Sequence, residues 1–246
     1  MTAKLYRINS FLSDVVSEML AESEGGFSKN VASVSLDKAR EYTRDVLGKH
    51  GKDIDEVLPG FDKNYSKLQK MTSGALDVPR IKMPVIEPSD MKKFDDRLKS
   101  GSLDIFKPYA KGKLYVPSGL DRDKKKADKW VKLGIADGNM GDDRVSARWT
   151  RVAAKDLLPT QSQIWLEKLA NNIGKFGPPK SGSPVLNTTI IVSKEGYILD
   201  GHHRFGQVML ANPNLKIKAL FIPLPIKLLL KIGRSYGNAV GNRQKG

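Results

Sequence analysis

The residue types best suited to chemistry stand together at positions 200–204, where the chain reads Asp-Gly-His-His-Arg. Two of the protein's three histidines are adjacent here, between a carboxylate and an arginine. An imidazole beside a carboxylate titrates near neutral pH and can accept or donate a proton, so Asp200, His202 and His203 are candidate catalytic residues. Arg204 is a candidate phosphate ligand, and Gly201 allows the chain to turn tightly beside it.

Two elements must position this cluster. Residues 187–193 precede it, are rich in β-branched side chains and predict a buried strand. Residues 205–211 follow it and carry Phe205, Val208 and Met209 at helical spacing. The cluster is therefore expected at a strand–turn–helix junction, where the unpaired N–H groups of a first helical turn favour anions such as phosphate.

Each of these residues also has a structural interpretation. Asp200 could cap the end of the strand, and Arg204 could form a salt bridge to Asp200 while still binding phosphate. Neighbouring residues at the start of a helix diverge by about 100°, so we expect one histidine to enter the site and the other to pack or orient. Two adjacent histidines lack the spacing with which histidine pairs usually bind zinc, so the motif alone predicts no metal site.

Charge is distributed unevenly along the 246 residues. Residues 1–147 carry 27 basic and 23 acidic side chains, whereas residues 148–246 carry 15 basic and 4 acidic ones, so the second part holds +11 of the net charge of +15. We favour a polyanionic partner, either nucleic acid or a nucleotide, because the excess accompanies the candidate anion site. The alternative is a solvated basic surface that keeps the protein soluble.

Composition excludes some classes of protein. The absence of cysteine rules out disulfides, thiolate metal sites and cysteine nucleophiles. The first residues lack the apolar run of a signal peptide, and the most apolar segment, 217–232, is too short and too interrupted by lysine and proline to span a membrane. We therefore expect a cytoplasmic protein without a membrane partner.

Residues 1–144 predict a mainly helical and partly irregular N-terminal region. Helical patterns cover residues 9–23, 35–47, 89–100 and 123–133. Ser35 and Ser89 are the expected N-caps of the second and third of these helices. The acidic turn 137–143 lacks the spacing of a calcium loop, and we interpret it as a solvent loop.

From residue 145 onward, strands and helices alternate. The patterns predict strands at 146–152, 187–193 and 216–223, and helices at 161–175, 205–211 and 225–232. Thr160 and Gln163 stand at the spacing of a capping box, which places the start of the first of these helices at Gln161. Residues 233–246 predict a basic flexible tail.

The order of these elements and the residues at their junctions resemble the ParB/sulfiredoxin superfamily over residues 145–230. The matching parts are residues 152–161 with the helix that follows, residues 188–193 and the Asp-Gly-His-His-Arg turn. The turn is similar to the Gly-Glu-Arg-Arg motif of ParB partition proteins and the Gly-Cys-His-Arg motif of sulfiredoxin. It is most similar to the form found in ParB-fold free-serine kinases and many phage-encoded ParB-like proteins. Residues 77–84 also resemble a leader segment upstream of this domain in tailed-phage proteins.

The resemblance implies an α+β fold, with a ParB/sulfiredoxin-like mixed-sheet domain at residues 145–232 that follows the helical region and precedes the tail. It also implies a pocket for nucleotide phosphates. The residues implied to bind phosphate or nucleotide are Gly201, Arg204, Thr160, Gln161 and Gln163. ATP or CTP is the implied ligand and Mg²⁺ a candidate cofactor, in the host cytoplasm if the protein is phage-encoded.

Departures from the family patterns narrow the function. Without cysteine, sulfinic-acid reduction is excluded. Only 16 residues follow Leu230, so we do not expect the helix-turn-helix and dimerisation domains of partition proteins. Free-serine kinases use an upstream glutamate as a general base, whereas Gln161 and Gln163 cannot ionise and Glu167 lies about two turns further along. A carboxylate from outside the motif, such as one from residues 137–143, would supply the base.

Three hypotheses for the function follow. The first is an enzyme, either a ParB-like nuclease or a nucleoside triphosphate hydrolase, that uses the turn from Asp200 to Arg204. The second is a nucleotide-dependent kinase of a small molecule such as a free amino acid. The third is a non-catalytic module that binds nucleic acid or associates with the virion, with the turn as a phosphate-binding site.

Overall fold

A computed structural model describes residues 30–79, 82–103, 105, 141–240 and 242. Helices and one mixed sheet of five strands make up these residues, which confirms the predicted α+β class. The helices of the first part are α2 (Leu36–Gly48), α3 (Ile54–Val57), α4 (Phe61–Ser73) and α5 (Pro88–Ser100). The second part contains β1 (Arg148–Ala153), η3 (Ala154–Asp156), β2 (Leu158–Pro159), α7 (Leu166–Phe176), α8 (Pro184–Asn187), β3 (Ile190–Val192), β4 (Tyr197–Asp200), α9 (His202–Ala211), β5 (Lys216–Phe221) and α10 (Ile226–Ala239).

The strands lie in the order β1-β5-β3-β4-β2. The pairs β1–β5 and β3–β4 are antiparallel, whereas β5–β3 and β4–β2 are parallel. The register places Ile191 opposite both Asp200 of β4 and Leu220 of β5. The carboxyl end of β4 therefore lies beside the beginning of β3, which sets the place of the candidate site in the sheet.

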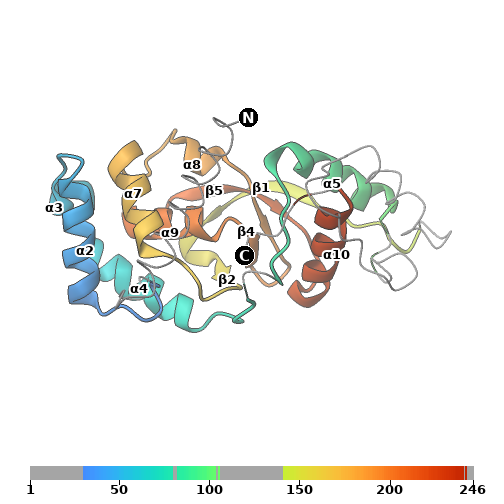
Figure 1. Ribbon diagram of the computed structural model, residues 1–246. Coiled ribbons are helices and arrows are strands. Elements are labelled where there is room, and N and C mark those ends of the chain that lie inside the picture. The colour runs from blue at the N-terminus through green and yellow to red at the C-terminus, as the bar shows by residue number, and fades with distance from the viewer. Residues whose placement is uncertain (1–29, 80–81, 104, 106–140, 241, 243–246) are drawn as a thin grey trace, which may run out of the picture.

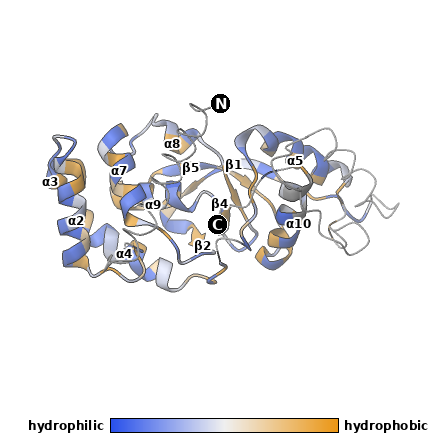
Figure 2. Ribbon diagram, in the orientation of Figure 1, coloured by the Kyte–Doolittle hydropathy of each residue, from blue (hydrophilic) through white to orange (hydrophobic). Residues whose placement is uncertain are grey.

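Side chains alternate between two cores, one on each face of the sheet. In β3, Ile190 and Val192 enter one core and Ile191 enters the other. A strand that is apolar at successive positions is buried on both faces, as a three-layer arrangement requires. In Figure 1 the sheet lies in the middle, with α2, α4, α7 and α9 on one side and α5 and α10 on the other. Figure 2 shows orange hydrophobic stretches in the central strand β4 and on one side of several helices, with blue hydrophilic residues on their other sides.

The predicted boundary at residues 144 and 145 does not separate two cores. The first core combines apolar residues of α2 and α4 with those of α7 and α9, and α2 packs against α7 while α4 packs against α9. The second combines α5 with α10 and the opposite face of the sheet. The helices of the first part therefore complete both outer layers around the sheet of the second part.

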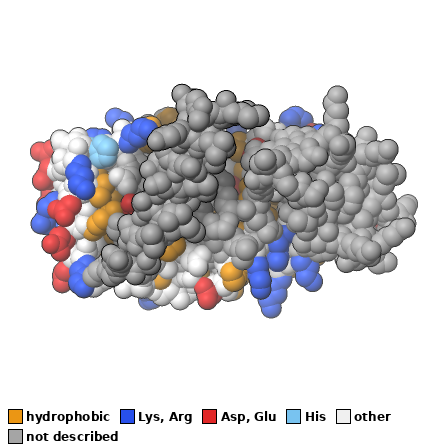
Figure 3. Space-filling view, viewed as in Figure 1, with side chains coloured by type: hydrophobic (Ala, Val, Ile, Leu, Met, Phe, Trp, Pro, Cys, Tyr) orange, Lys and Arg blue, Asp and Glu red, His pale blue; other side chains and the backbone are white. Residues whose placement is uncertain are grey.

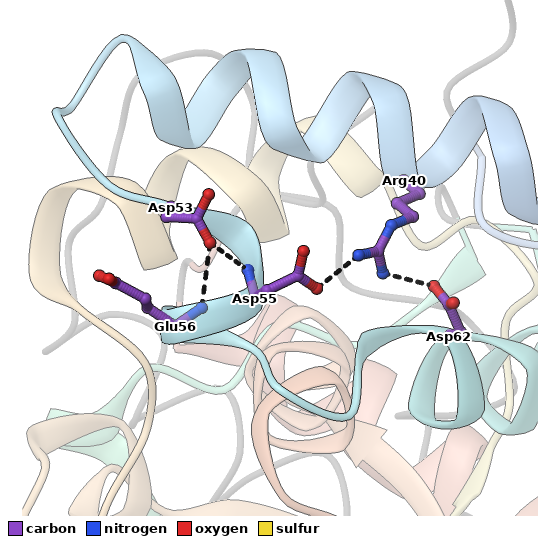
Figure 4. Close-up of polar contacts among 5 residues, drawn as sticks. All are labelled: Arg40, Asp53, Asp55, Glu56 and Asp62. Carbon is purple, nitrogen blue, oxygen red and sulfur yellow. Dashed lines mark hydrogen bonds and ion pairs between the residues drawn. The ribbon is translucent and has the colours of Figure 1, made fainter.

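Polar contacts join α2 to the two helices that follow it (Figure 4). Arg40 of α2 forms ion pairs with Asp55 of α3 and with Asp62 of α4, the latter at 2.8 Å. These carboxylates raise the pKa of Arg40 above its usual value. Asp53 is the N-cap of α3, and its carboxylate accepts hydrogen bonds from the N–H groups of Asp55 and Glu56.

Replacing the Asp53 cap is expected to destabilise the protein modestly. An Asp53→Ala variant should lose about 1 kcal/mol of unfolding free energy in urea, because two N–H groups of α3 lose their acceptor. Ser35→Ala is the matched control, since Ser35 is the N-cap of α2 but its side chain makes no capping hydrogen bond. An equal loss in both variants would contradict the capping role of Asp53.

Several predicted elements agree with the structure and three need correction. The strands predicted at 187–193 and 216–223 correspond to β3 and β5, and the helices predicted at 35–47 and 205–211 correspond to α2 and α9. The helix predicted from Ser89 begins one residue earlier with Pro88, and its N-cap is Glu87, because proline favours the first helical position. The helices predicted at 9–23 and 123–133 lie outside the described residues.

The predicted flexible tail is the second correction. Helix α10 does not end at residue 232 but continues to Ala239. Tyr236 is fully buried in the second core, where its ring packs on Phe94 of α5 at a centroid distance of 4.8 Å. Asn242 is also buried and donates a hydrogen bond to Asp90 of α5. Burial of these side chains against α5 keeps the segment helical where its composition alone predicted fraying.

Among the described residues, no helix is both long and apolar enough to cross a membrane.

Candidate functional site

The predicted turn forms the junction between β4 and α9. Asp200 is the last residue of β4, Gly201 is the N-cap of α9, and His202 begins the helix. Gly201 has φ = 105°, a conformation that residues with a Cβ rarely adopt. A Cβ at this position would also lie 2.4 Å from Cγ2 of Ile190 and 2.9 Å from an Nη atom of Arg204. Glycine is therefore needed here for both backbone conformation and space.

Arg204 folds back over this glycine. One Nη atom donates to the carboxylate of Asp200 at 2.9 Å and to the carbonyl oxygen of Thr189 at 3.1 Å. The side chains of Arg204 and Asp200 are 24% and 35% exposed, so solvent or a ligand reaches both. The buried Nε of Arg204 has no hydrogen-bond partner among the described residues. The guanidinium is thus held in place while part of its donor capacity stays unused.

His202 is the histidine that packs. It is only 3% exposed, and its Nε2 accepts a hydrogen bond from the backbone N–H of Thr160 at 3.1 Å. Burial lowers its pKa to about 3, with further lowering by the charges of His203 and Arg204. The ring is therefore neutral at neutral pH, and its Nε2 is occupied by Thr160. In this geometry His202, predicted as a catalytic candidate, is a positioning residue.

The hydrogen bonds around Thr160 fix the tautomer of this ring. Because Nε2 accepts from the N–H of Thr160, the ring proton must be on Nδ1. The Thr160 hydroxyl lies 2.8 Å from Nε2 and 2.7 Å from the carbonyl oxygen of Ile198, and it has one proton to donate to either. His202 thereby ties the segment after β2 to strand β4 and to the start of α9.

His203 points along a different direction and is half-buried. Its Nε2 lies 3.4 Å from the backbone nitrogen of Trp165, which immediately precedes α7. Of the two histidines, it is the more exposed one, and it directly precedes Arg204 in the chain.

The capping box predicted at Thr160 and Gln163 does not form, which is the third correction. Helix α7 begins at Leu166 rather than Gln161, and its N-cap is Trp165. Instead, the Thr160 hydroxyl donates to the carbonyl oxygen of Ile198, and the Thr160 N–H donates to His202. These partners lie 38 and 42 residues away in sequence. Long-range contacts therefore prevent the local cap.

The two glutamines lie in the irregular segment before α7. Gln161 is 6% exposed, and its buried Oε1 has no hydrogen-bond partner among the described residues. Gln163 is half-buried. The structure thus brings Thr160 to the histidine turn through direct hydrogen bonds, with Gln161 next to it in the chain.

Residues 77 and 78 also reach this place, although the sequence did not mark them as site residues. Val78 donates its N–H to the carbonyl oxygen of Thr160 at 3.0 Å, and the carboxylate of Asp77 accepts from Ser162 at 2.5 Å. Asp77 has φ = 52°, a left-handed conformation that aspartate tolerates better than most residues. The similarity of residues 77–84 to a phage leader segment was the signal that could have marked them.

A base from the acidic turn 137–143 is not supported by its described part. Residues 137–140 lie outside the described residues. Asp143 is 2% exposed, and its carboxylate accepts from the N–H of Ile105, which belongs to the core on the opposite face of the sheet. Among the described residues, no group of three or more histidine, aspartate or glutamate side chains could hold a metal ion.

Comparisons of the chain with models of protein families, with curated proteins and with solved structures gave no match. The function must therefore be argued from the chemistry of the β4–α9 junction itself.

Proposed function

We propose that the β4–α9 junction binds a phosphate group and that the protein acts on nucleic acid or a nucleotide in the manner of a ParB/sulfiredoxin-like domain. The observation that carries this proposal is the position of Arg204. Its guanidinium is fixed by Asp200 and by Thr189 beside the first turn of α9. A pre-positioned guanidinium next to helical N–H groups is a common arrangement for phosphate recognition.

The start of α9 supports an external anion. Helices α2, α3, α4, α5 and α7 each carry an acidic residue in the first turn, which offsets the positive end of the helix dipole. Helix α9 has none, as is also the case for α8 and α10, and its N-cap Gly201 offers no side chain to accept from the first N–H groups. A bound phosphate would supply both the negative charge and the acceptors.

Gln161 adds a second indication. A buried amide oxygen without a partner costs free energy, of the order of 1–3 kcal/mol, unless something satisfies it. This oxygen needs a hydrogen-bond donor, which a ribose hydroxyl or an amino group of a nucleotide would offer and an ionised phosphate would not. This is consistent with the implied role of Gln161 in binding.

The groups that could move a proton are Asp200 and His203, since His202 is enclosed. In this proposal Asp200 orients Arg204 and takes part in cleavage or transfer of the phosphoryl group, and His203 is the more exposed imidazole of the turn. ATP or CTP with Mg²⁺, or a DNA phosphate, are the ligands to test. The basic excess of residues 148–246 favours DNA among the larger substrates.

Nucleotide-induced stabilisation tests the site directly. ATP or CTP with magnesium, at about 100 times the dissociation constant, should raise the melting temperature of the wild-type protein by about 5–10 °C. Arg204→Ala should abolish this increase, and Arg204→Lys should reduce it, because lysine keeps the charge but loses the planar donor pair. Arg40→Ala is the matched control, since Arg40 also pairs with carboxylates but lies among α2, α3 and α4.

If nucleotide raises the melting temperature of Arg204→Ala as much as that of the wild type, Arg204 does not bind the phosphate. The same preparations, incubated with plasmid DNA with and without magnesium, test for chemistry. Nicking by the wild-type protein that disappears in Asp200→Asn supports the nuclease. Nicking that persists in Asp200→Asn places the activity elsewhere.

A further inference from the structure

We infer that strands β1 and β5 form a second binding surface, which holds a single-stranded nucleic acid by base stacking and phosphate contacts. The surface consists of Trp149, Arg151, Lys216 and Lys218, which the antiparallel register places on one face of the two strands. This goes beyond the phosphate site at Arg204, because none of its residues belongs to the β4–α9 turn.

The charged residues of the surface are all basic, and such an arrangement does not stabilise a sheet. Neither β1 nor β5 contains an acidic residue. Arg151 and Lys218 are direct partners in the antiparallel register, and like charges placed opposite one another destabilise a strand pair. A polyanion lying across both strands would relieve this repulsion.

Trp149 provides the stacking group. Its side chain is 40% exposed, although tryptophan is mostly buried in folded proteins. Its indole N–H donates to the buried carboxylate of Asp95 at 2.8 Å, which fixes the ring against α5. The ammonium group of Lys218 lies 5.2 Å from the centre of the ring, so a cation accompanies the aromatic face. Exposed rings with adjacent cations are how proteins bind unpaired bases without sequence preference.

Strand β1 is at the edge of the described sheet, where it pairs with β5 alone. An open edge could also accept a strand from another protein, but exposed charged side chains along an edge oppose such pairing. Arg148 and Arg151 are both exposed. The chemistry of the edge therefore favours a phosphate backbone over an added β-strand.

One short segment contacts both the surface and the phosphate site. Arg151 donates to the side chain of Asn187, and Arg204 donates to the carbonyl oxygen of Thr189. Figure 1 shows α8, which ends at Asn187, beside β5 and β1. Figure 3 shows basic side chains next to α10 as well, whereas the visible acidic ones lie mostly over the α2–α3 end.

Binding of a fluorescent oligothymidylate of about 20 nucleotides tests the inference, since this exceeds the ~4–16 nucleotides that one small domain covers. The affinity should fall with salt with a slope near −2, as about three phosphate contacts predict. Trp149→Ala should weaken binding by about 5- to 150-fold with little change in slope, whereas Lys218→Gln should reduce the slope by about 0.7. An oligouridylate in parallel distinguishes DNA from RNA.

Matched variants separate stacking from folding and from general charge. Trp149→Phe keeps a ring but loses the bond to Asp95, and it should retain most of the binding. Phe176→Ala is the control for an exposed aromatic beside a lysine, since Phe176 is 74% exposed and lies 5.2 Å from Lys175 on α7. Normal affinity in Trp149→Ala, equal losses in Trp149→Phe and Trp149→Ala, or an equal loss in Phe176→Ala would overturn the inference.

Two further outcomes distinguish this surface from other partners and from the phosphate site. Equal competition by polyglutamate would show an acidic-protein surface and overturn the nucleic-acid assignment. Arg204→Ala should keep most of the oligonucleotide affinity while losing nucleotide-induced stabilisation, and Trp149→Ala should show the reverse. Loss of both properties in both variants would show that there is a single site.

Discussion

A Gly201→Ala variant is expected to lose about 2–5 kcal/mol of unfolding free energy. About 1–2 kcal/mol comes from the positive φ of this position, and a further ~1–3 kcal/mol comes from forcing a methyl group into packed space. The methyl would lie 2.4 Å from Cγ2 of Ile190, a core residue with no exposed surface. It would also lie 2.9 Å from an Nη atom of Arg204, so the guanidinium must move.

Gly182→Ala separates these two contributions. Gly182 also has a positive φ, 85°, but a Cβ there would meet nothing within 4 Å. This control should therefore lose only the conformational part, about 1–2 kcal/mol, when both variants are unfolded in urea. Gly201→Ala should additionally lose nucleotide-induced stabilisation. Equal losses in the two variants, or a Gly201→Ala protein that still responds to nucleotide, would contradict the close packing of Arg204 on this glycine.

The stability of the protein is expected to fall as pH drops from about 6.5 to about 3, in part because of His202. Its pKa falls from the ordinary histidine value of 6.5 to about 3 in the folded protein, where burial disfavours the charged ring. The unfolded chain therefore binds a proton in this window that the folded protein does not, and acid favours unfolding. Between the two pKa values, the unfolding free energy falls by up to about 1.4 kcal/mol per pH unit. Below both pKa values it no longer changes with pH on account of His202.

Urea unfolding between pH 7 and pH 3.5 measures this contribution as a difference between proteins. His202→Gln keeps an acceptor for the N–H of Thr160 but does not titrate, so its unfolding free energy should depend less steeply on pH than that of the wild type. Parallel curves for His202→Gln and the wild type would show that His202 is protonated or solvated in the folded protein.

These expectations assign different tasks to neighbouring residues of one motif. Gly201 leaves space for the side chains of Ile190 and Arg204, and His202 bonds to the segment after β2. In the proposed function, Arg204 donates hydrogen bonds to the ligand. The arrangement explains why the motif joins a small residue, an imidazole and a guanidinium within four positions. Each task depends on a partner from another part of the chain: Ile190, Thr160 and Thr189.

Local sequence determined the elements around the site. The β-branched run before the motif forms β3, the alternating segment at 216–223 contains β5, and the helical spacing after the motif forms α9. These elements follow from the periodicity of the hydrophobic residues and from residue propensities, which both act over a few neighbouring residues. The resemblance that their order carries implied the α+β class, which the helices and the mixed sheet confirm. The role of the glycine in the turn was also predictable, because a strand that passes directly into a helix needs a residue with an unrestricted φ.

Only the tertiary structure decided which side chains meet. The sequence could not show which histidine packs, because burial of His202 depends on Thr160 and Ile198 from distant segments. The same contacts cancel the apparent capping box of Thr160 and Gln163 and delay the start of α7 to Leu166. Helix α10 continues into the predicted tail because Tyr236 is buried against α5. Long-range hydrogen bonds and burial outweighed local preference at each of these positions, and no pattern of neighbouring residues contains that information.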